Sequence, residues 1–210
     1  SAFVIGRLNI SGRVSDVAAS GGFAYLANRS SVLVVDATDP STASVVGSVA
    51  TPGTALRIVE SGGFAYVADS STGGLAVLDG GAPTAPSLAG SLATTAFSED
   101  VAVDGSVAYL LDDADGVRVI DVSTPSSPAL VTTVDTPGSP RRLTASGGRV
   151  YVADGGSGLQ VIDASVPASA SIVGTIATGE FAEAVAASGS FAYVAAESVG
   201  VAIVDVSMAG

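Results

Sequence analysis

The charged residues that could bind a ligand in this 210-residue chain recur at five places, 41–43 residues apart. The dipeptides at these places are Ser15-Asp16, Leu56-Arg57, Glu99-Asp100, Arg141-Arg142 and Glu183-Ala184. A repeat architecture would gather them around one axis, with signs that run minus, plus, minus, plus, minus. Asp16 and Glu183 would then meet as like charges, with Arg13 nearby. Guanidinium groups bind carboxylates and phosphates through paired hydrogen bonds, so such a ring could hold an anion.

The same residues support two interpretations. In the simpler one, to which we give precedence, arginines and carboxylates of neighbouring repeats form ion pairs that set the register between repeats, each worth about 0–1 kcal/mol. In the other, Arg57, Arg141 and Arg142 hold an anionic ligand in a central polar pocket, while carboxylates accept hydroxyl groups or bind a cation. The candidate ligand-binding residues are Arg13, Asp16, Arg57, Glu99, Asp100, Arg141, Arg142 and Glu183.

A second candidate site is a weak calcium motif. The segment Asp113-Ala114-Asp115-Gly116 resembles the core of a calcium loop, although the remaining ligands and the terminal glutamate are missing. Turn capping is the alternative role for both aspartates. Because the chain has no His and no Cys, a bound metal would have to be a hard, oxygen-ligated cation. Calcium is therefore the one cofactor that the sequence suggests, and we expect no other.

The missing residue types restrict catalysis. Without His, Cys or Lys, the common nucleophile–base triads and Schiff-base chemistry cannot be built. A glycoside hydrolase that uses two carboxylates remains an alternative, with its carboxyl groups roughly 5–10 Å apart across an open cleft. Such sites often hold sugars on aromatic rings, and this chain has no Trp. We therefore expect a binding protein rather than an enzyme.

The elements that carry these residues repeat with the same period. All five tyrosines, at positions 25, 66, 109, 151 and 193, lie in one recurring phrase. A second phrase ends in aspartate at Asp36, Asp79, Asp121, Asp163 and Asp205. A sustained period of this length with strand-like content indicates a repeat fold.

One repeat unit predicts four strands. In the second unit, strand-like runs cover 55–60, 64–69, 75–79 and 87–93, and Gly, Ser or Pro separate them. Four-stranded sheets that are apolar on both faces are stable when stacked radially. The sequence therefore predicts an all-β, five-bladed β-propeller in a single domain, residues 1–210, with the tyrosines in the core between blades. The blades are expected at 14–50, 55–93, 98–135, 140–177 and 182–206.

The two ends predict how the ring closes. The segment Phe3–Ile10 (FVIGRLNI) is similar to the fourth-strand runs 44–50 and 171–177, whereas the last unit stops after a third strand at 201–206. We expect residues 2–10 to complete the last blade as its fourth strand and so leave no open edge.

The third-strand phrases VLVVD, LAVLD, VRVID, LQVID and VAIVD resemble the LVIVD repeat, and Asp121–Pro125 matches its usual continuation. The likeness covers essentially the whole chain, with Gly80-Gly81 as one departure after Asp79. Propellers of this family occur mainly in secreted or surface proteins of bacteria and archaea, and many have no assigned activity. The resemblance implies an extracytoplasmic propeller and supplies no catalytic residues.

A net charge of −12 disfavours binding to nucleic acid and to anionic lipid. No apolar stretch reaches the length of a membrane-spanning helix, so we expect no membrane insertion and a monomer. No targeting segment is visible in these residues, and we expect native targeting sequences to lie outside them. The first expectation for function is a non-catalytic scaffold that binds a protein or glycan through its charged rim. The alternatives are a lectin-like binder of glycans or small ligands, the glycoside hydrolase, and an evolved, reconstructed or trimmed propeller without a function.

Overall fold

The computed structural model describes residues 2–70 and 73–207, and β-strands dominate this part of the chain. The strands are β1 (Val14–Ser20), β2 (Phe23–Asp36), β3 (Ser44–Ser61), β4 (Phe64–Ser70), β5 (Gly74–Asp79), β6 (Ser87–Leu92), β7 (Ser98–Asp104), β8 (Val107–Asp112), β9 (Gly116–Asp121), β10 (Ala129–Val134), β11 (Arg142–Ser146), β12 (Arg149–Ala153), β13 (Leu159–Asp163), β14 (Ser171–Ile176), β15 (Ala182–Ser188), β16 (Phe191–Ala196) and β17 (Gly200–Asp205). Two short 3-10 helices are η1 (Pro167–Ser169) and η2 (Glu197–Val199).

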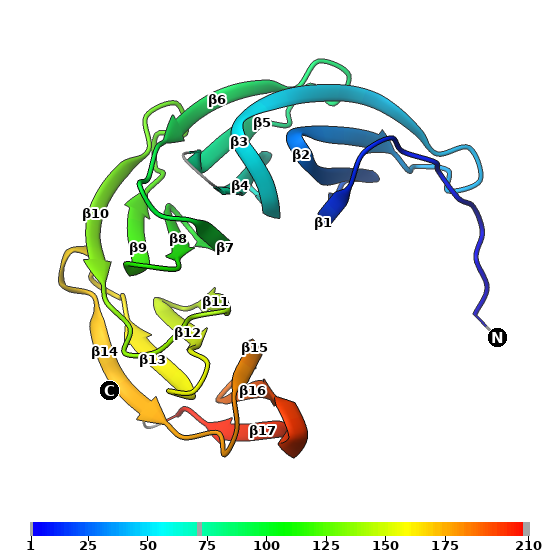
Figure 1. Cartoon of the computed structure of the whole chain (residues 1–210). Coiled ribbons are helices and arrows are strands. Elements are labelled where there is room, and N and C mark those ends of the chain that lie inside the picture. Colours follow the sequence, from blue (N-terminus) through cyan, green and yellow to red (C-terminus); the bar gives the residue numbers. More distant parts are fainter. Residues whose placement is uncertain (1, 71–72, 208–210) are drawn as a thin grey trace.

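The strands form antiparallel blades that fan out around a centre, which confirms the predicted all-β propeller architecture (Figure 1). Each blade starts with a strand at the centre and steps outward. Two of the observed strands each contain two of the strands that the sequence predicted. The long β2 contains the second and third strands of blade 1, and β3 contains the fourth strand of blade 1 and the first strand of blade 2. Blades 1 and 2 are therefore one six-stranded sheet, whereas blades 3 and 4 have four strands and blade 5 has three.

Short turn signals decide where each strand ends. The first hairpin of blade 2 turns at Gly62 and Gly63, whose φ angles of 63° and 84° are open to glycine at little cost. Each third strand ends in the aspartate of the repeat, which accepts a hydrogen bond from the backbone N–H two residues later. These pairs are Asp36 with Thr38, Asp79 with Gly81, Asp121 with Ser123, Asp163 with Ser165 and Asp205 with Ser207. The aspartates that make the repeat recognisable are thus turn caps.

The core lies between neighbouring blades. Tyr25 packs with Val32 and Val34 against Ile58 and Val67 of blade 2, and the next two interfaces repeat this arrangement around Tyr66 and Tyr109. The fourth interface does so around Tyr151, and all four tyrosines are buried. The structure therefore confirms that these rings serve as inter-blade core.

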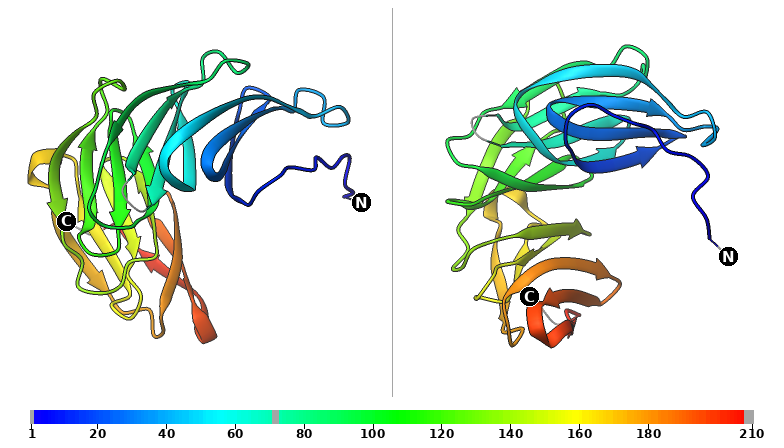
Figure 2. Two further views of the ribbon diagram at one scale, coloured as in Figure 1. Left: turned by 45° about the horizontal axis from the view of Figure 1, so that its top comes forward. Right: turned by 45° about the vertical axis from the view of Figure 1, so that its right-hand side comes forward.

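The predicted closure is not formed in this structure. Residues 2–10 form no strand, are largely exposed and extend past blade 1 at the open end of the arc (Figures 1 and 2). Blade 5 keeps three strands, and the ends of the arc lie apart. The packing between blades sets the angle of each step, and five such steps do not complete a turn. The N-terminal segment consequently does not reach β17.

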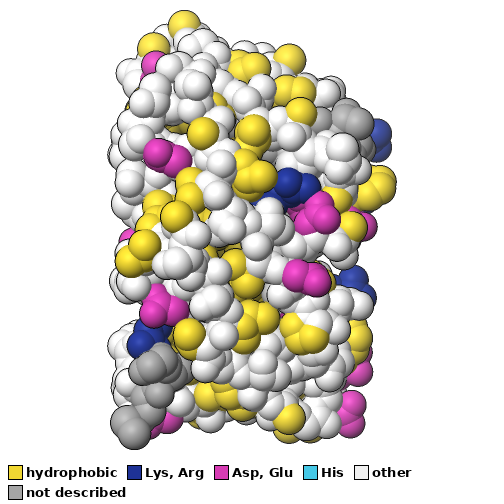
Figure 3. Space-filling model, turned by 90° about the vertical axis from the view of Figure 1, so that its left-hand side faces the viewer, with side chains coloured by type: hydrophobic (Ala, Val, Ile, Leu, Met, Phe, Trp, Pro, Cys, Tyr) yellow, Lys and Arg dark blue, Asp and Glu magenta, His cyan; other side chains and the backbone are white. Residues whose placement is uncertain are grey.

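The convex side of the arc, which carries β10 and β14, shows apolar side chains in small groups, with acidic and basic side chains scattered between them (Figure 3). The strongest concentration of arginine lies elsewhere, at the centre of the arc. Within the described residues, no helix has the length and hydropathy needed to cross a membrane.

Two tyrosines in equivalent positions test the inter-blade core. We expect Tyr109→Ala to lower the free energy of unfolding by about 3–5 kcal/mol, because the change leaves a cavity in a packed interface. Tyr193→Ala, on the uncovered face of blade 5, is expected to cost about 1 kcal/mol or less. Urea denaturation at concentrations where the chain is monomeric measures both. Equal losses would show that the face of blade 5 is covered in solution.

Candidate functional site

A β-bulge sits at the same place in the innermost strand of four blades. The strand register shifts between Val14 and Asp16, Ala55 and Arg57, Ser98 and Asp100, and Ala182 and Ala184. In blade 4, β11 starts one residue after Arg141, whose N–H donates to the carbonyl of Ala153. A bulge inserts one residue and re-aims the side chains around it. The five charged dipeptides of the sequence lie at these positions.

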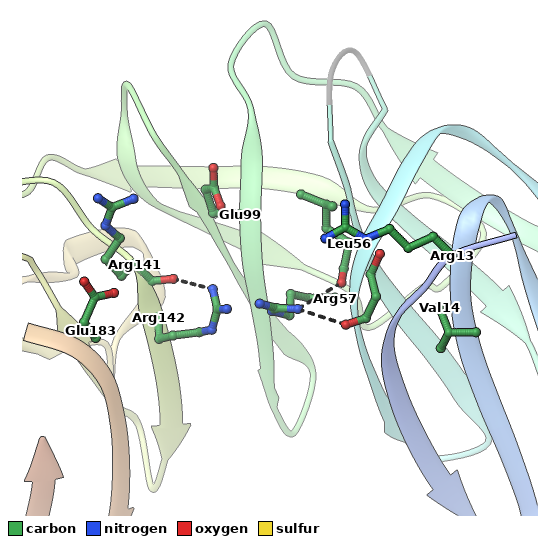
Figure 4. A pocket seen from close by; sticks show the side chains of 9 residues that line it. Arg13, Val14, Leu56, Arg57, Glu99, Arg141, Arg142 and Glu183 are labelled. Atoms are coloured by element: carbon green, nitrogen blue, oxygen red, sulfur yellow. Dashed lines mark hydrogen bonds between the residues drawn. The ribbon is translucent and has the colours of Figure 1, made fainter. Parts of the chain in front are cut away.

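These positions surround one pocket at the centre of the arc, with a volume of about 410 Å³ (Figure 4). The structure brings together six of the eight predicted ligand-binding residues in its lining: Arg13, Arg57, Glu99, Arg141, Arg142 and Glu183. Val14, Ser15 and Leu56 complete the lining. Asp16 and Asp100 are outside this set.

Asp16 and Asp100 connect neighbouring blades. An oxygen of Asp16 accepts a hydrogen bond from the N–H of Ile58 in blade 2 at 3.0 Å. Asp100 accepts from Leu143 in blade 4 and from Val101, each at 3.0 Å. Both carboxylates therefore point sideways, to the backbone of the next blade, and Asp100 has no oxygen free of such bonds to offer a ligand.

The predicted ring of ion pairs is absent from the part of the chain that the structure describes, where only Arg118 forms ion pairs, with Asp112 and Asp115. The expectation that arginines and carboxylates of neighbouring repeats pair was wrong. The bulge is the reason, because it directs Asp16 and Asp100 to backbone N–H groups. Between blades 1 and 2 and between blades 3 and 4, these hydrogen bonds connect the neighbouring blades where charge pairs were expected.

The pocket arginines have no carboxylate partner in the described structure. Arg57 donates to the carbonyl oxygens of Ser15 and Leu56 at 3.3 Å, and Arg142 donates to that of Arg141 at 2.8 Å. The Arg141 guanidinium lies over the ring of Phe181, 5.3 Å from its centroid. Arg57 and Arg142 point toward one another across the pocket (Figure 4). Four of the eight arginines of an acidic chain line this one pocket.

The environment of Asp100 disfavours the ionised form of its carboxyl group. Burial raises the pKa of the Asp100 carboxyl to about 6, although the N–H groups of Leu143 and Val101 and the charge of Arg57 act in the opposite direction. The charge of Asp16 adds to the increase. The group lies next to the pocket, so its ionisation changes the potential that the arginines create there.

Three further aspartates of the repeat are buried. Asp69, Asp112 and Asp154 each follow the repeat tyrosine by three residues and are fully buried. Asp69 accepts the N–H group of Gly53 in β3, Asp154 accepts that of Gly138 in the loop before blade 4, and Asp112 accepts the hydroxyl of Ser98. Burial raises the pKa of all three carboxyl groups. Their fixed distance from the tyrosine makes them part of the repeat, and their hydrogen bonds give them a structural role.

The calcium motif has internal partners. Asp115 pairs with Arg118, and Asp113 accepts the N–H of Phe97 at 3.1 Å. Among the residues of known position, no group of three or more acidic side chains could hold a metal ion. The geometry gives the prediction of calcium binding at Asp113 and Asp115 no support.

Known proteins resemble this chain in its repeat sequence and in its fold. The LVIVD repeat model matches residues 11–51, 52–94, 97–136, 137–178 and 180–208. The crystal structure of the computationally designed Ika8 protein superposes with a TM-score of 0.75 at 12% identity, covering 92% of this chain and 58% of Ika8. The Pan2 WD40 domain of Neurospora crassa gives 0.66 at 13% identity, covering 90% of this chain and 62% of that domain. The chain spans less than two thirds of either structure, and the likeness concerns the fold alone. None of the curated proteins matches the sequence.

The raised pKa of Asp100 has a measurable consequence. Between about pH 4 and pH 6 the folded protein keeps the Asp100 proton, whereas the unfolded chain has already lost it near pH 4. Folding therefore binds a proton, and this group makes the free energy of unfolding fall as the pH rises through that window, by on the order of 2 kcal/mol. Asp100→Asn is expected to remove this part of the decrease, measured by urea denaturation from pH 4 to pH 7.

Carboxyl-carbon NMR titration provides the direct measurement. The midpoint for Asp100 is expected near 6 in the unmodified protein. Arg57→Gln should raise it and Asp16→Asn should lower it, because each change removes one charge that acts on the carboxyl group. A midpoint near 4 in all three proteins would contradict this account.

Proposed function

The chain belongs to the LVIVD repeat family, which is defined by its repeat and not by a reaction, and we propose its function from the central pocket. We propose that the chain is a non-catalytic binding module for a small organic acid that carries hydroxyl groups, such as a sugar acid. The ligand enters the central pocket at the bulges. This proposal narrows the glycan or small-ligand alternative to one class of molecule and one site. The extracytoplasmic location expected from the repeat is part of it.

One observation carries the proposal: Arg57 and Arg142 face each other across the pocket with no carboxylate between them (Figure 4). Two guanidinium groups that converge repel each other unless an anion lies between them. Their bonds to carbonyl oxygens orient the side chains and leave further N–H donors. A carboxylate can accept from both and gain the strength of charge-assisted hydrogen bonds.

The rest of the lining supports an acid with hydroxyl groups. Glu99 and Glu183 are acceptors for ligand hydroxyls, and their charges oppose a ligand that is anionic throughout. A volume of about 410 Å³ lies in the range of small-molecule sites and has room for a monosaccharide. The net charge of −12 repels large polyanions, whereas a small acid is exposed mainly to the local arginines.

The pocket favours a single ligand per chain. The dipeptides at the five equivalent positions differ from one another, so the pocket has no five-fold set of equivalent subsites. The glycoside hydrolase alternative would have to use Glu99 and Glu183, because the oxygens of Asp100 are bonded to backbone N–H groups. No observation favours that use.

Calorimetric titration with D-glucuronate, with D-glucose as the uncharged comparison, tests the proposal. We expect one binding site for glucuronate and none for glucose. At 100 times the dissociation constant the ligand should add about 2.7 kcal/mol to the free energy of unfolding. Absence of binding by glucuronate, galacturonate and other hydroxy acids would overturn the proposal.

Two variants locate the site. Arg57→Gln and Arg142→Gln should each weaken glucuronate binding by at least about tenfold, since a hydrogen bond to a charged group is worth about 1.5–3 kcal/mol. Arg29→Gln is the matched control, because it removes the same charge from an exposed residue outside the lining. Equal losses in all three variants would indicate a nonspecific effect of net charge.

A further inference from the structure

The last blade exposes a face that every other blade covers. Tyr193, Val201 and Ile203 are 39%, 61% and 66% exposed. Their equivalents in blades 1 to 4 are buried in the inter-blade core: the tyrosines at 25, 66, 109 and 151, and the third-strand residues Val32, Val34, Leu75, Val77, Val117, Val119, Leu159 and Val161. In the other blades this face packs against the back of the next blade, that is, the face that carries the first-strand residues equivalent to Val17. The same kind of surface is therefore expected to cover the face of blade 5.

The other end of the arc presents such a surface. Val17 in β1 is 55% exposed, whereas its equivalents Ile58, Val101 and Leu143 are buried against the preceding blade. Val14 is exposed too, although the equivalent positions in blades 2, 3 and 5 are buried. The two ends of the arc are thus the two halves of one more inter-blade interface.

The N-terminal segment already lies where a fourth strand of a preceding blade belongs. A side chain at Gly6 would collide with the carbonyl oxygen of Pro40 in the loop that follows β2. Gly47 and Gly90, in the fourth strands of blades 1 and 2, meet the carbonyl oxygens of Pro83 and Pro125 in the same way. Within this segment, Phe3, Val4 and Ile5 remain exposed.

We propose that these ends bind each other between two copies of this chain, head to tail. The exposed face of blade 5 of one copy packs on the back of blade 1 of the next, and β17 takes residues 3–10 of that copy as its fourth strand. The register follows from the other blades, in which Val161 lies opposite Gly174 and Leu159 opposite Ile176. Ile203 is accordingly placed opposite Gly6, and Val201 opposite Leu8.

A second copy fits this structure better than the chain's own N-terminus. The segment and β17 lie at separate ends of the arc (Figures 1 and 2). Closure within one chain would have to tighten four inter-blade interfaces that are already buried and close-packed, and packed interfaces resist a change of angle. Binding of a second copy leaves the four existing inter-blade interfaces unchanged. The contact joins unlike surfaces, so the assembly either closes into a ring of copies or continues as a chain.

Sedimentation velocity over a range of protein concentrations tests for association. We expect a concentration-dependent increase in mass that strengthens with salt, because a net charge of −12 on each copy opposes contact and salt screens it. Ile203→Lys should weaken association at least about tenfold, because it places an unpaired charge in the interface. Val173→Lys is the control, since Val173 is an exposed apolar residue of β14 on the outer side of blade 4. Circular dichroism checks that both variants fold.

Cysteine pairing tests the register and the occupant, and the chain has no cysteine of its own. In the double variant Leu8→Cys with Val201→Cys, oxidation should produce covalent dimers and larger species on non-reducing gels. The control, Arg7→Cys with Val201→Cys, places the first thiol on the opposite face of the strand and should give little cross-linking. A cross-linked monomer would mean that the chain closes on itself, and a monomer without cross-links would mean that the ends do not pair. Either result overturns the proposal.

Discussion

The packing of one blade on the next is the interaction on which the rest of this protein depends. No blade can bury both of its apolar faces alone, so each tyrosine and the third-strand residues beside it need a neighbouring sheet. This packing fixes the angle between blades and therefore the curvature of the arc. It also brings five strand starts, far apart in the sequence, to one centre, where Arg57, Glu99 and Arg142 line one pocket.

The fold could be predicted because its signal is long-range and redundant. Five tyrosines and five turn-capping aspartates in constant phase allow few architectures, and the same phase placed the charged dipeptides around the axis. Side-chain direction within the site could not be predicted. A bulge is a local departure from strand alternation, so nothing in the spacing showed that Asp16 and Asp100 would face the backbone of the next blade.

Closure of the ring was the other feature beyond the reach of the pattern. The segment FVIGRLNI forms no strand in the structure, although Gly6 meets Pro40 as Gly47 meets Pro83. The number of blades in a full turn, however, depends on a small rotation at each step. Side-chain volumes at the interfaces set that rotation, and it accumulates over the chain. A repeat period shows that the units have equal length, but it does not determine the rotation from one blade to the next.

Unequal hydrogen bonding between the blades makes the arc unequal in stiffness. Asp16 ties blade 1 to blade 2, Asp100 ties blade 3 to blade 4, and Arg149 bonds across to the Val206 carbonyl beside blade 5. Between blades 2 and 3, the described residues provide only the bonds of their connecting loop and an apolar contact around Tyr66. Packed apolar surfaces resist a large change of angle, but a contact without directional bonds across it tolerates small displacements at lower cost. Bending of the molecule should thus concentrate at the joint between blades 2 and 3. This joint lies between Arg57 and Glu99, so bending there changes the width of the pocket opening.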